Sequence, residues 1–150
     1  MIEAAGYLVR VKVYNTYLYL LGYPHGHNKW TIFKGCLKRG ETHQHTAQRE
    51  LFEESNIDLD DPNIKILNKD YKSNIINVYN LKKKRITVFL VDINLESYKK
   101  LNLCCNSLID GTYNPEIVEY DLFTADELEM VLLNSQKHLA KVVKELESNK

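Results

Sequence analysis

The chain has 150 residues, of which 44% are hydrophobic. This length and composition predict one domain, residues 1–150, with a buried core. Twenty Lys and Arg side chains balance twenty Asp and Glu, so the formal net charge is zero. This balance argues against a general nucleic-acid-binding protein, which normally has a basic excess, and no DNA partner is expected.

The targeting and redox signals favour a cytoplasmic protein. The sequence shows no signal-peptide pattern and no apolar run long enough to span a bilayer, so no membrane partner is expected. Cys36, Cys104 and Cys105 do not have the spacing of a metal site or a disulfide framework. Their odd number agrees with a reducing compartment.

The first third of the chain predicts strands followed by a helix. Residues 7–13 alternate apolar and charged side chains, which is typical of a half-buried strand, and 17–21 predict its returning partner. Residues 22–29 are rich in turn formers, and 30–33 predict a short strand. Thr42 is a suitable N-cap for a helix that ends near Ser55, and Asn56 suits the left-handed position after it.

The remainder predicts further strands and a helical end. Strands are expected at 64–67, 74–79 and 117–123, and the strongly apolar residues 86–93 predict a central strand. Residues 94–115 predict a loop, with one helical turn near Tyr98. Thr124 and Glu127 form a capping-box pattern, and residues 139–146 have the spacing of an amphipathic helix. The expected fold class is therefore α/β, an α/β/α sandwich around a mixed sheet.

Three glutamates stand out within the helix predicted after Thr42. Glu50, Glu53 and Glu54 have the spacing i, i+3 and i+4, which places them on one helical face. Because like charges repel, this arrangement is unfavourable unless a cation lies among them. Magnesium prefers oxygen ligands and is commonly held by carboxylates together with substrate phosphates. The pattern indicates either a metal site for phosphate chemistry or an exposed acidic helix.

The flanking residues favour the metal site. The stretch resembles the Nudix box, in which Gly is followed after five residues by Glu and after seven more by Arg-Glu-apolar-x-Glu-Glu-x-Gly-apolar. The matching positions are Gly35, Glu41, Arg49, Glu50, Leu51, Glu53, Glu54 and Ile57. Asn56 stands where the family usually has Gly. Since Asn tolerates left-handed backbone, the helix end is still expected to form.

This resemblance implies a Nudix-type α/β/α sandwich and a hydrolase that cleaves a phosphoanhydride bond in a nucleoside diphosphate derivative. It also implies a site that holds Mg²⁺ or Mn²⁺. The implied metal ligands are the carbonyl of Gly35 and the carboxylates of Glu50, Glu53, Glu54 and Glu116, and the implied catalytic residues are Glu53, Arg49, Glu41 and Glu116. Arg49 would pair with Glu41 and orient the box; the alternative is an ordinary surface ion pair. Glu119 is the alternative to Glu116 as the carboxylate recruited from outside the box.

Residues outside the box give weaker indications of the substrate. Trp30-Thr31-x-x-Lys34-Gly35 resembles the W-T-x-P-K-G segment of the diadenosine tetraphosphate hydrolase branch, although Phe33 replaces the Pro. The order of Tyr79, the basic residues 82–85 and the apolar strand is also similar to that branch, as is the spacing of Glu116 and Tyr120. Lys34 would place a positive charge on a phosphate. Tyr79 would stack on a base, or else pack in the sheet.

The other polar candidates are weaker. The basic residues 82–85 would attract a polyphosphate, or simply form a charged hairpin turn. His25 and His27 lie in the loop predicted over the site, where either could touch phosphate, and His43 and His45 lie on the first turn of the acidic helix. With no partners evident in the sequence, all four are expected to be solvated.

Three functional hypotheses follow. The first is a hydrolase of nucleotide polyphosphates, with dinucleoside polyphosphates such as diadenosine tetraphosphate as the leading substrate. The second is an RNA 5′-end pyrophosphohydrolase or decapping enzyme, which the neutral net charge disfavours. The third is a nucleotide-binding Nudix module without catalysis, and the complete set of box carboxylates disfavours it. The sequence does not determine the oligomeric state.

Overall fold

A computed structural model describes residues 1–149, so residue 150, the last position of the predicted domain, lies outside the described part. Within these residues six strands form one mixed sheet in the order β4-β5-β1-β2-β6, and β3 pairs with β1. The strands are β1 (Ile2–Val13), β2 (Thr16–Pro24), β3 (Phe33–Cys36), β4 (Ile75–Leu81), β5 (Lys84–Asn94) and β6 (Ile117–Phe123). The helices are α1 (His43–Ser55), α2 (Leu95–Lys99), α3 (Ala125–Val131) and α4 (Leu139–Ser148), with a 3₁₀ turn η1 (Asn134–Gln136) before α4.

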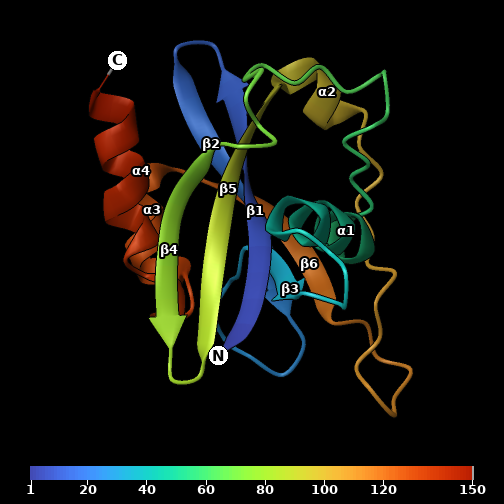
Figure 1. Cartoon of the computed structure of the whole chain (residues 1–150). Coiled ribbons are helices and arrows are strands. Elements are labelled where there is room, and N and C mark those ends of the chain that lie inside the picture. The colour runs from blue at the N-terminus through green and yellow to red at the C-terminus, as the bar shows by residue number, and fades with distance from the viewer. Residues whose placement is uncertain (150) are drawn as a thin grey trace.

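Helices cover both faces of this sheet, as Figure 1 shows with α3 and α4 on one side and α1 on the other. Tyr7 and Val9 of β1 belong to the core beneath α1, which also contains Leu51. Leu8, the residue between them, belongs to the opposite core, together with Val143 of α4. Successive strand residues point to opposite faces, so one strand serves both cores. The predicted α/β/α sandwich around a mixed sheet is confirmed.

Strand β1 is more deeply buried than its sequence pattern indicates. Residues 4–11 are all buried, whereas alternating polarity predicted a strand with one solvated face. The prediction was wrong because both faces are covered, and because the charge of Arg10 is neutralised internally. The Arg10 Nε and Nη2 atoms donate to the two carboxylate oxygens of Asp92 on β5, at 2.7 and 2.9 Å. A buried charge paired in this way avoids most of its desolvation penalty.

Several predicted boundaries moved. The strand predicted at 30–33 begins only at Phe33, and Trp30 and Thr31 form isolated bridges instead. The strand predicted at 64–67 is reduced to one bridge between Ile66 and Ile93. By contrast, β6 has the predicted bounds, and the capping box of Thr124 and Glu127 is present at the start of α3. Among residues 1–149, no helix is both long and apolar enough to cross a membrane.

Candidate active site

Helix α1 forms the acidic side of the site, and local sequence determines both of its ends. The Thr42 hydroxyl accepts a hydrogen bond from the His45 N–H at 3.1 Å, the usual role of an N-cap. Asn56 follows the helix with φ 66° and ψ 15°, and its N–H donates to the Phe52 carbonyl at 2.8 Å. The predicted cap and the predicted left-handed residue are both confirmed. Ala47 and Leu51 pack in the core, which turns the glutamate face of α1 toward β3.

Arg49 joins the glutamates of the loop and the helix. Its Nε and Nη2 atoms donate to the two oxygens of Glu41 at 2.7 and 2.9 Å, and its Nη1 atom donates to Glu50 at 2.9 Å and to Glu53 at 3.1 Å. The Arg49 side chain is 19% exposed. Hydrogen bonding to Arg49 lowers the pKa of Glu41 to about 2. The bidentate, largely buried pair of Arg49 and Glu41 therefore differs from the alternative, an exposed surface ion pair.

Glycine at position 35 allows β3 to approach this helix. A Cβ atom placed on Gly35 would lie 2.1 Å from Oε1 of Glu50, far inside van der Waals contact. Burial raises the pKa of Glu50, the charge of Glu53 raises it further, and Arg49 opposes the shift. The backbone of Gly35 and the carboxylate of Glu50 therefore share a crowded and strongly charged space.

Glu54 and Glu116 form a second pair of carboxylates, next to the glutamates that are bonded to Arg49. Glu54 is only 6% exposed, and its Oε1 accepts a hydrogen bond from the Lys34 backbone N–H at 3.0 Å. Burial raises its pKa well above the ordinary value, and the neighbouring carboxyls of Glu50 and Glu116 add to this shift. Glu119, the alternative outer carboxylate, lies exposed on β6 and does not line the pocket described next.

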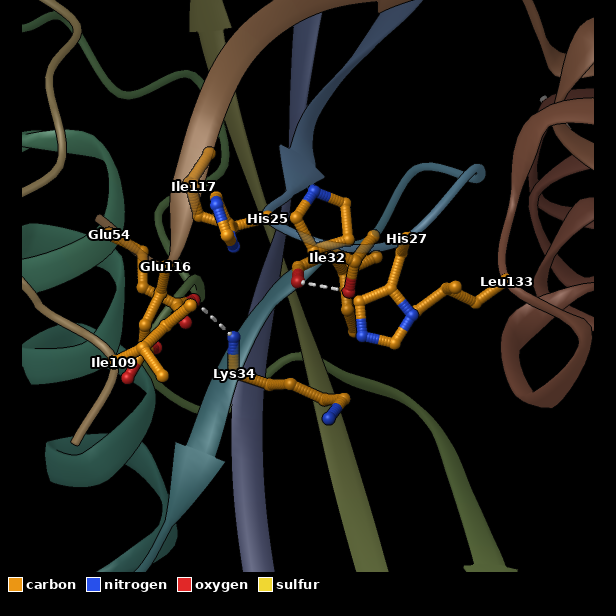
Figure 2. Close-up of a pocket in the computed structure, with 11 residues that line it drawn as sticks. His25, His27, Ile32, Lys34, Glu54, Ile109, Glu116, Ile117 and Leu133 are labelled. Carbon is orange, nitrogen blue, oxygen red and sulfur yellow. Dashed lines mark hydrogen bonds between the residues drawn. The ribbon is translucent and has the colours of Figure 1, made fainter. Parts of the chain in front are cut away.

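A pocket of about 490 Å³ opens beside Glu54 and Glu116. In Figure 2 these two carboxylates lie together near α1, and the Lys34 side chain extends away from them. Burial lowers the pKa of Lys34, and the charge of Lys84 lowers it further. The pocket is lined by Pro24, His25, His27, Thr31, Ile32, Lys34, Glu54, Ile109, Glu116, Ile117 and Leu133. The pocket thus has an acidic end, formed by Glu54 and Glu116, and a basic end, formed by Lys34.

Tyr79, the predicted stacking residue, does not line this pocket. It is 9% exposed and belongs to the core between the sheet and α4, where its ring meets His138 edge to face at 4.6 Å between centroids. Its hydroxyl is buried and has no hydrogen-bond partner among the described residues. Sheet packing therefore describes its position, and a stacking role stays a prediction.

The pocket contains residues that were not among the predicted site residues. His25 and His27 are exposed, as expected, and both line the pocket. Their position in a loop over the site was the available signal. Ile109 and Leu133 come from segments far from the box in sequence, and no local pattern marked them. His43, also expected to be solvated, pairs with Glu3 at 3.0 Å.

The donor chemistry of this region fits a divalent cation. Among residues 1–149, no three His, Cys, Asp or Glu side chains are already grouped to hold a metal. Arg49 forms ion pairs with Glu50 and Glu53, two of the carboxylates that were predicted to bind the metal. However, the candidates are all oxygen donors, and the neighbouring Glu116 carboxyl helps to raise the pKa of both Glu50 and Glu54. A cation that prefers oxygen ligands relieves such repulsion.

A mixed sheet between two helical layers, with a carboxylate-rich helix beside a charged pocket, places this chain in the class of α/β/α sandwich proteins and matches the Nudix fold. The family model described as NUDIX domain matches residues 9–146 of this chain, and the chain belongs to the Nudix family. It is an enzyme, a Nudix pyrophosphohydrolase. Members of this family act on nucleotide-linked substrates and generally depend on divalent metals.

Solved structures agree with this assignment at the level of fold. The Ap4A hydrolase of C. elegans in a binary complex is similar with a TM-score of 0.72 and 18% identity, and the match covers 100% of both chains. A NUDIX hydrolase of Listeria monocytogenes has a TM-score of 0.63 and 20% identity over 97% of this chain and 94% of the other. A MutT protein of Methanosarcina mazei has a TM-score of 0.60 and 16% identity over the same shares. No curated protein matches this sequence.

Proposed function

We propose that this Nudix hydrolase uses a divalent cation to cleave a phosphoanhydride bond in a dinucleoside polyphosphate, with diadenosine tetraphosphate as the leading candidate. The observation that carries the proposal is the shared pocket of Glu54, Glu116 and Lys34 beside the glutamates linked by Arg49. A polyphosphate chain needs cations along its length, and this pocket has a carboxylate end, proposed to bind a metal, and a lysine end. The full-length fold similarity to the C. elegans Ap4A hydrolase supports the choice of substrate.

The residues proposed to hold Mg²⁺ or Mn²⁺ are those of the acidic end. They are the carbonyl of Gly35 and the carboxylates of Glu50, Glu53, Glu54 and Glu116. When bound, such a cation neutralises phosphate charge and activates a water molecule for attack on phosphorus.

The chain's own residues would position the reactants. Arg49 holds the loop carboxylate of Glu41 against α1 through its two-pronged pair, which fixes the loop that begins at Gly35. Glu53 is the most exposed of the carboxylates bonded to Arg49, at 33%, so its carboxylate can accept a proton from water. Lys34 would contact a phosphate oxygen as a point charge. The proposed role of Glu41 and Arg49 is thus orientation. Glu53 is proposed to accept a proton and to bind the metal, and Glu116 to bind the metal.

The test is a substrate panel with purified protein and Mg²⁺. The panel contains dinucleoside polyphosphates, nucleoside triphosphates, sugar nucleotides and capped RNA, with products separated by ion-exchange chromatography. We expect fastest turnover of diadenosine tetraphosphate, with release of ATP and AMP. Faster turnover of capped RNA would replace the proposed substrate class with RNA 5′ ends, and turnover of no member would reject the proposed function.

The same assay tests the acidic end of the pocket. Glu53→Gln should reduce kcat by about 10²-fold or more, because it removes a group proposed both to bind the cation and to accept a proton from water. Glu119→Gln is the matched control, since Glu119 is an exposed glutamate of β6 outside the pocket. Equal activity of the two variants would reject the assignment of Glu53.

A further inference from the structure

The C-terminal end of α1 is joined to the segment that leads to Glu116. The last carbonyls of a helix have no partner within the helix and need donors from elsewhere. Here the Glu53 carbonyl accepts from the Asn106 N–H at 2.7 Å, and the Ser55 carbonyl accepts from the Cys104 N–H at 3.3 Å. The Tyr120 hydroxyl donates to the Glu54 carbonyl between them. The segment 102–107 is therefore docked on the helix that carries the box glutamates.

The side chain of Asn56 reinforces this docking. Its Nδ2 donates to the Asn102 carbonyl at 2.9 Å, and its Oδ1 accepts from Nδ2 of Asn106 at 3.4 Å. Glycine, the usual family residue at this position, would adopt the left-handed backbone of φ 66° more easily but would make neither bond. The departure from the box pattern thus adds two contacts between α1 and segment 102–107.

The docked segment in turn sets the position of Glu116. The Ser107 carbonyl, next to the docked Asn106, accepts the Glu116 N–H at 2.9 Å. A bridge between Leu108 and Pro115 closes the loop between them. From the other side, the Glu116 carbonyl accepts the His25 N–H at 2.9 Å. A shift of segment 102–107 relative to α1 would therefore move Glu116 relative to Glu54.

We infer that Asn56 is a positioning residue: its amide docks segment 102–107 on α1 and thereby holds the Glu116 carboxylate beside Glu54. The inference rests on the proposed function for the role of Glu116 in hydrolysis. The docking itself is independent of that role, because it consists of hydrogen bonds between α1 and segment 102–107. Asn56 touches neither the pocket nor the reacting atoms, so its effect on hydrolysis passes through Glu116.

The experiment combines kinetics with amide hydrogen exchange. Asn56→Gly keeps the left-handed backbone and removes both side-chain bonds, so kcat for diadenosine tetraphosphate should fall about fivefold to tenfold. In a Glu116→Gln background the same change should alter kcat less than about twofold, because the group it positions has lost its charge. A residue that only stabilised the helix end would lower kcat equally in both backgrounds, and that result would overturn the inference.

Tyr14→Gly is the matched control. Tyr14 also has a positive φ, 56°, but is exposed in the turn between β1 and β2. It should change neither kcat nor exchange in segment 102–107. Asn56→Gly should speed exchange of the Cys104 and Asn106 amides in the metal-free protein, and unchanged exchange would overturn the docking. If the wild type hydrolyses no substrate, the proposed function fails, while the exchange measurement still decides whether Asn56 docks the segment.

Discussion

Gly35 illustrates at the scale of one residue how the box depends on the lack of a side chain. The nearest atoms to a Cβ built there are the two oxygens and the carboxyl carbon of Glu50, all closer than 2.7 Å. Since these atoms end a flexible side chain, Gly35→Ala should leave the fold intact but displace the Glu50 carboxylate. We expect a fall in kcat of about 10²-fold with a change of less than about 2 °C in Tm, measured by steady-state kinetics and thermal melting.

Cys36→Ala is the control for this prediction. Cys36 is the next residue of the same strand and its thiol is exposed. Both substitutions introduce alanine. It should retain nearly the wild-type kcat. Full activity in Gly35→Ala would show that the Glu50 carboxylate is not needed at its present position.

At the scale of elements, the 3₁₀ turn η1 supports one wall of the pocket through a single buried side chain. Gln136 is fully buried; its Oε1 accepts the Ile32 N–H at 3.0 Å, and its Nε2 donates to the Thr31 hydroxyl at 2.8 Å. Both Thr31 and Ile32 line the pocket. Gln136 therefore connects the helical layer of α3 and α4 to the segment just before β3.

Replacing this glutamine should destabilise the protein measurably. Gln136→Met nearly preserves volume but leaves the buried Ile32 N–H without its partner, which costs about 1–3 kcal/mol of the free energy of unfolding. Urea denaturation at pH 7 would measure the loss. Asn134→Ala, at an exposed position of the same turn, should change stability by less than about 0.5 kcal/mol. A loss equal to that of the control would mean that water satisfies the Ile32 N–H after substitution.

Local patterns predicted the elements that depend on neighbouring residues. The cap at Thr42, the left-handed Asn56 and the capping box of Thr124 follow from hydrogen bonds within about four residues, so the sequence contains their whole explanation. The spacing of the box glutamates likewise follows from the helical period.

Contacts between distant segments account for what sequence reasoning missed. Arg10 meets Asp92 from 82 positions away, and Gln136 meets Thr31 from 105 positions away. No local period records such pairs, so the burial of Arg10 and the support of the pocket wall were not predicted. Tyr79 shows the same limit: its order along the chain agreed with a binding residue, but its position among core residues is set by α4.

At the scale of the whole molecule, the pocket lies where all three layers of the sandwich contribute. Glu54 comes from α1 on one face of the sheet, Lys34 from the sheet itself, and Leu133 from the segment after α3 on the other face. Figure 1 shows these layers on either side of the strands. The Glu54 carboxyl is buried among like charges, an arrangement that is unfavourable for stability and that the proposed cation would relieve. The proposed function therefore couples stability and activity at Glu54.

This coupling predicts opposite effects of Glu54→Gln with and without metal. Burial raises the pKa of Glu54 in the folded state above its value in the unfolded state. The favourable contribution of this shift to the free energy of unfolding is therefore complete below about pH 4.5 and is lost as pH rises through the folded-state pKa. Its ionised form thus destabilises the metal-free protein at pH 8. The neutral amide can still accept the Lys34 N–H. In chelator at pH 8, Glu54→Gln should therefore melt about 2–4 °C above the wild type, a gain of about 1 kcal/mol, and this gap should narrow toward pH 5.

With Mg²⁺ at about 100 times its dissociation constant, the wild type should gain about 2.7 kcal/mol, and the variant much less, because one ligand is gone. Calorimetry of both proteins and of Glu119→Gln, whose glutamate is exposed, separates this effect from a general loss of charge. A variant that melts below the wild type in chelator would contradict the argument, since it would show that the buried carboxylate stabilises the fold even without a cation.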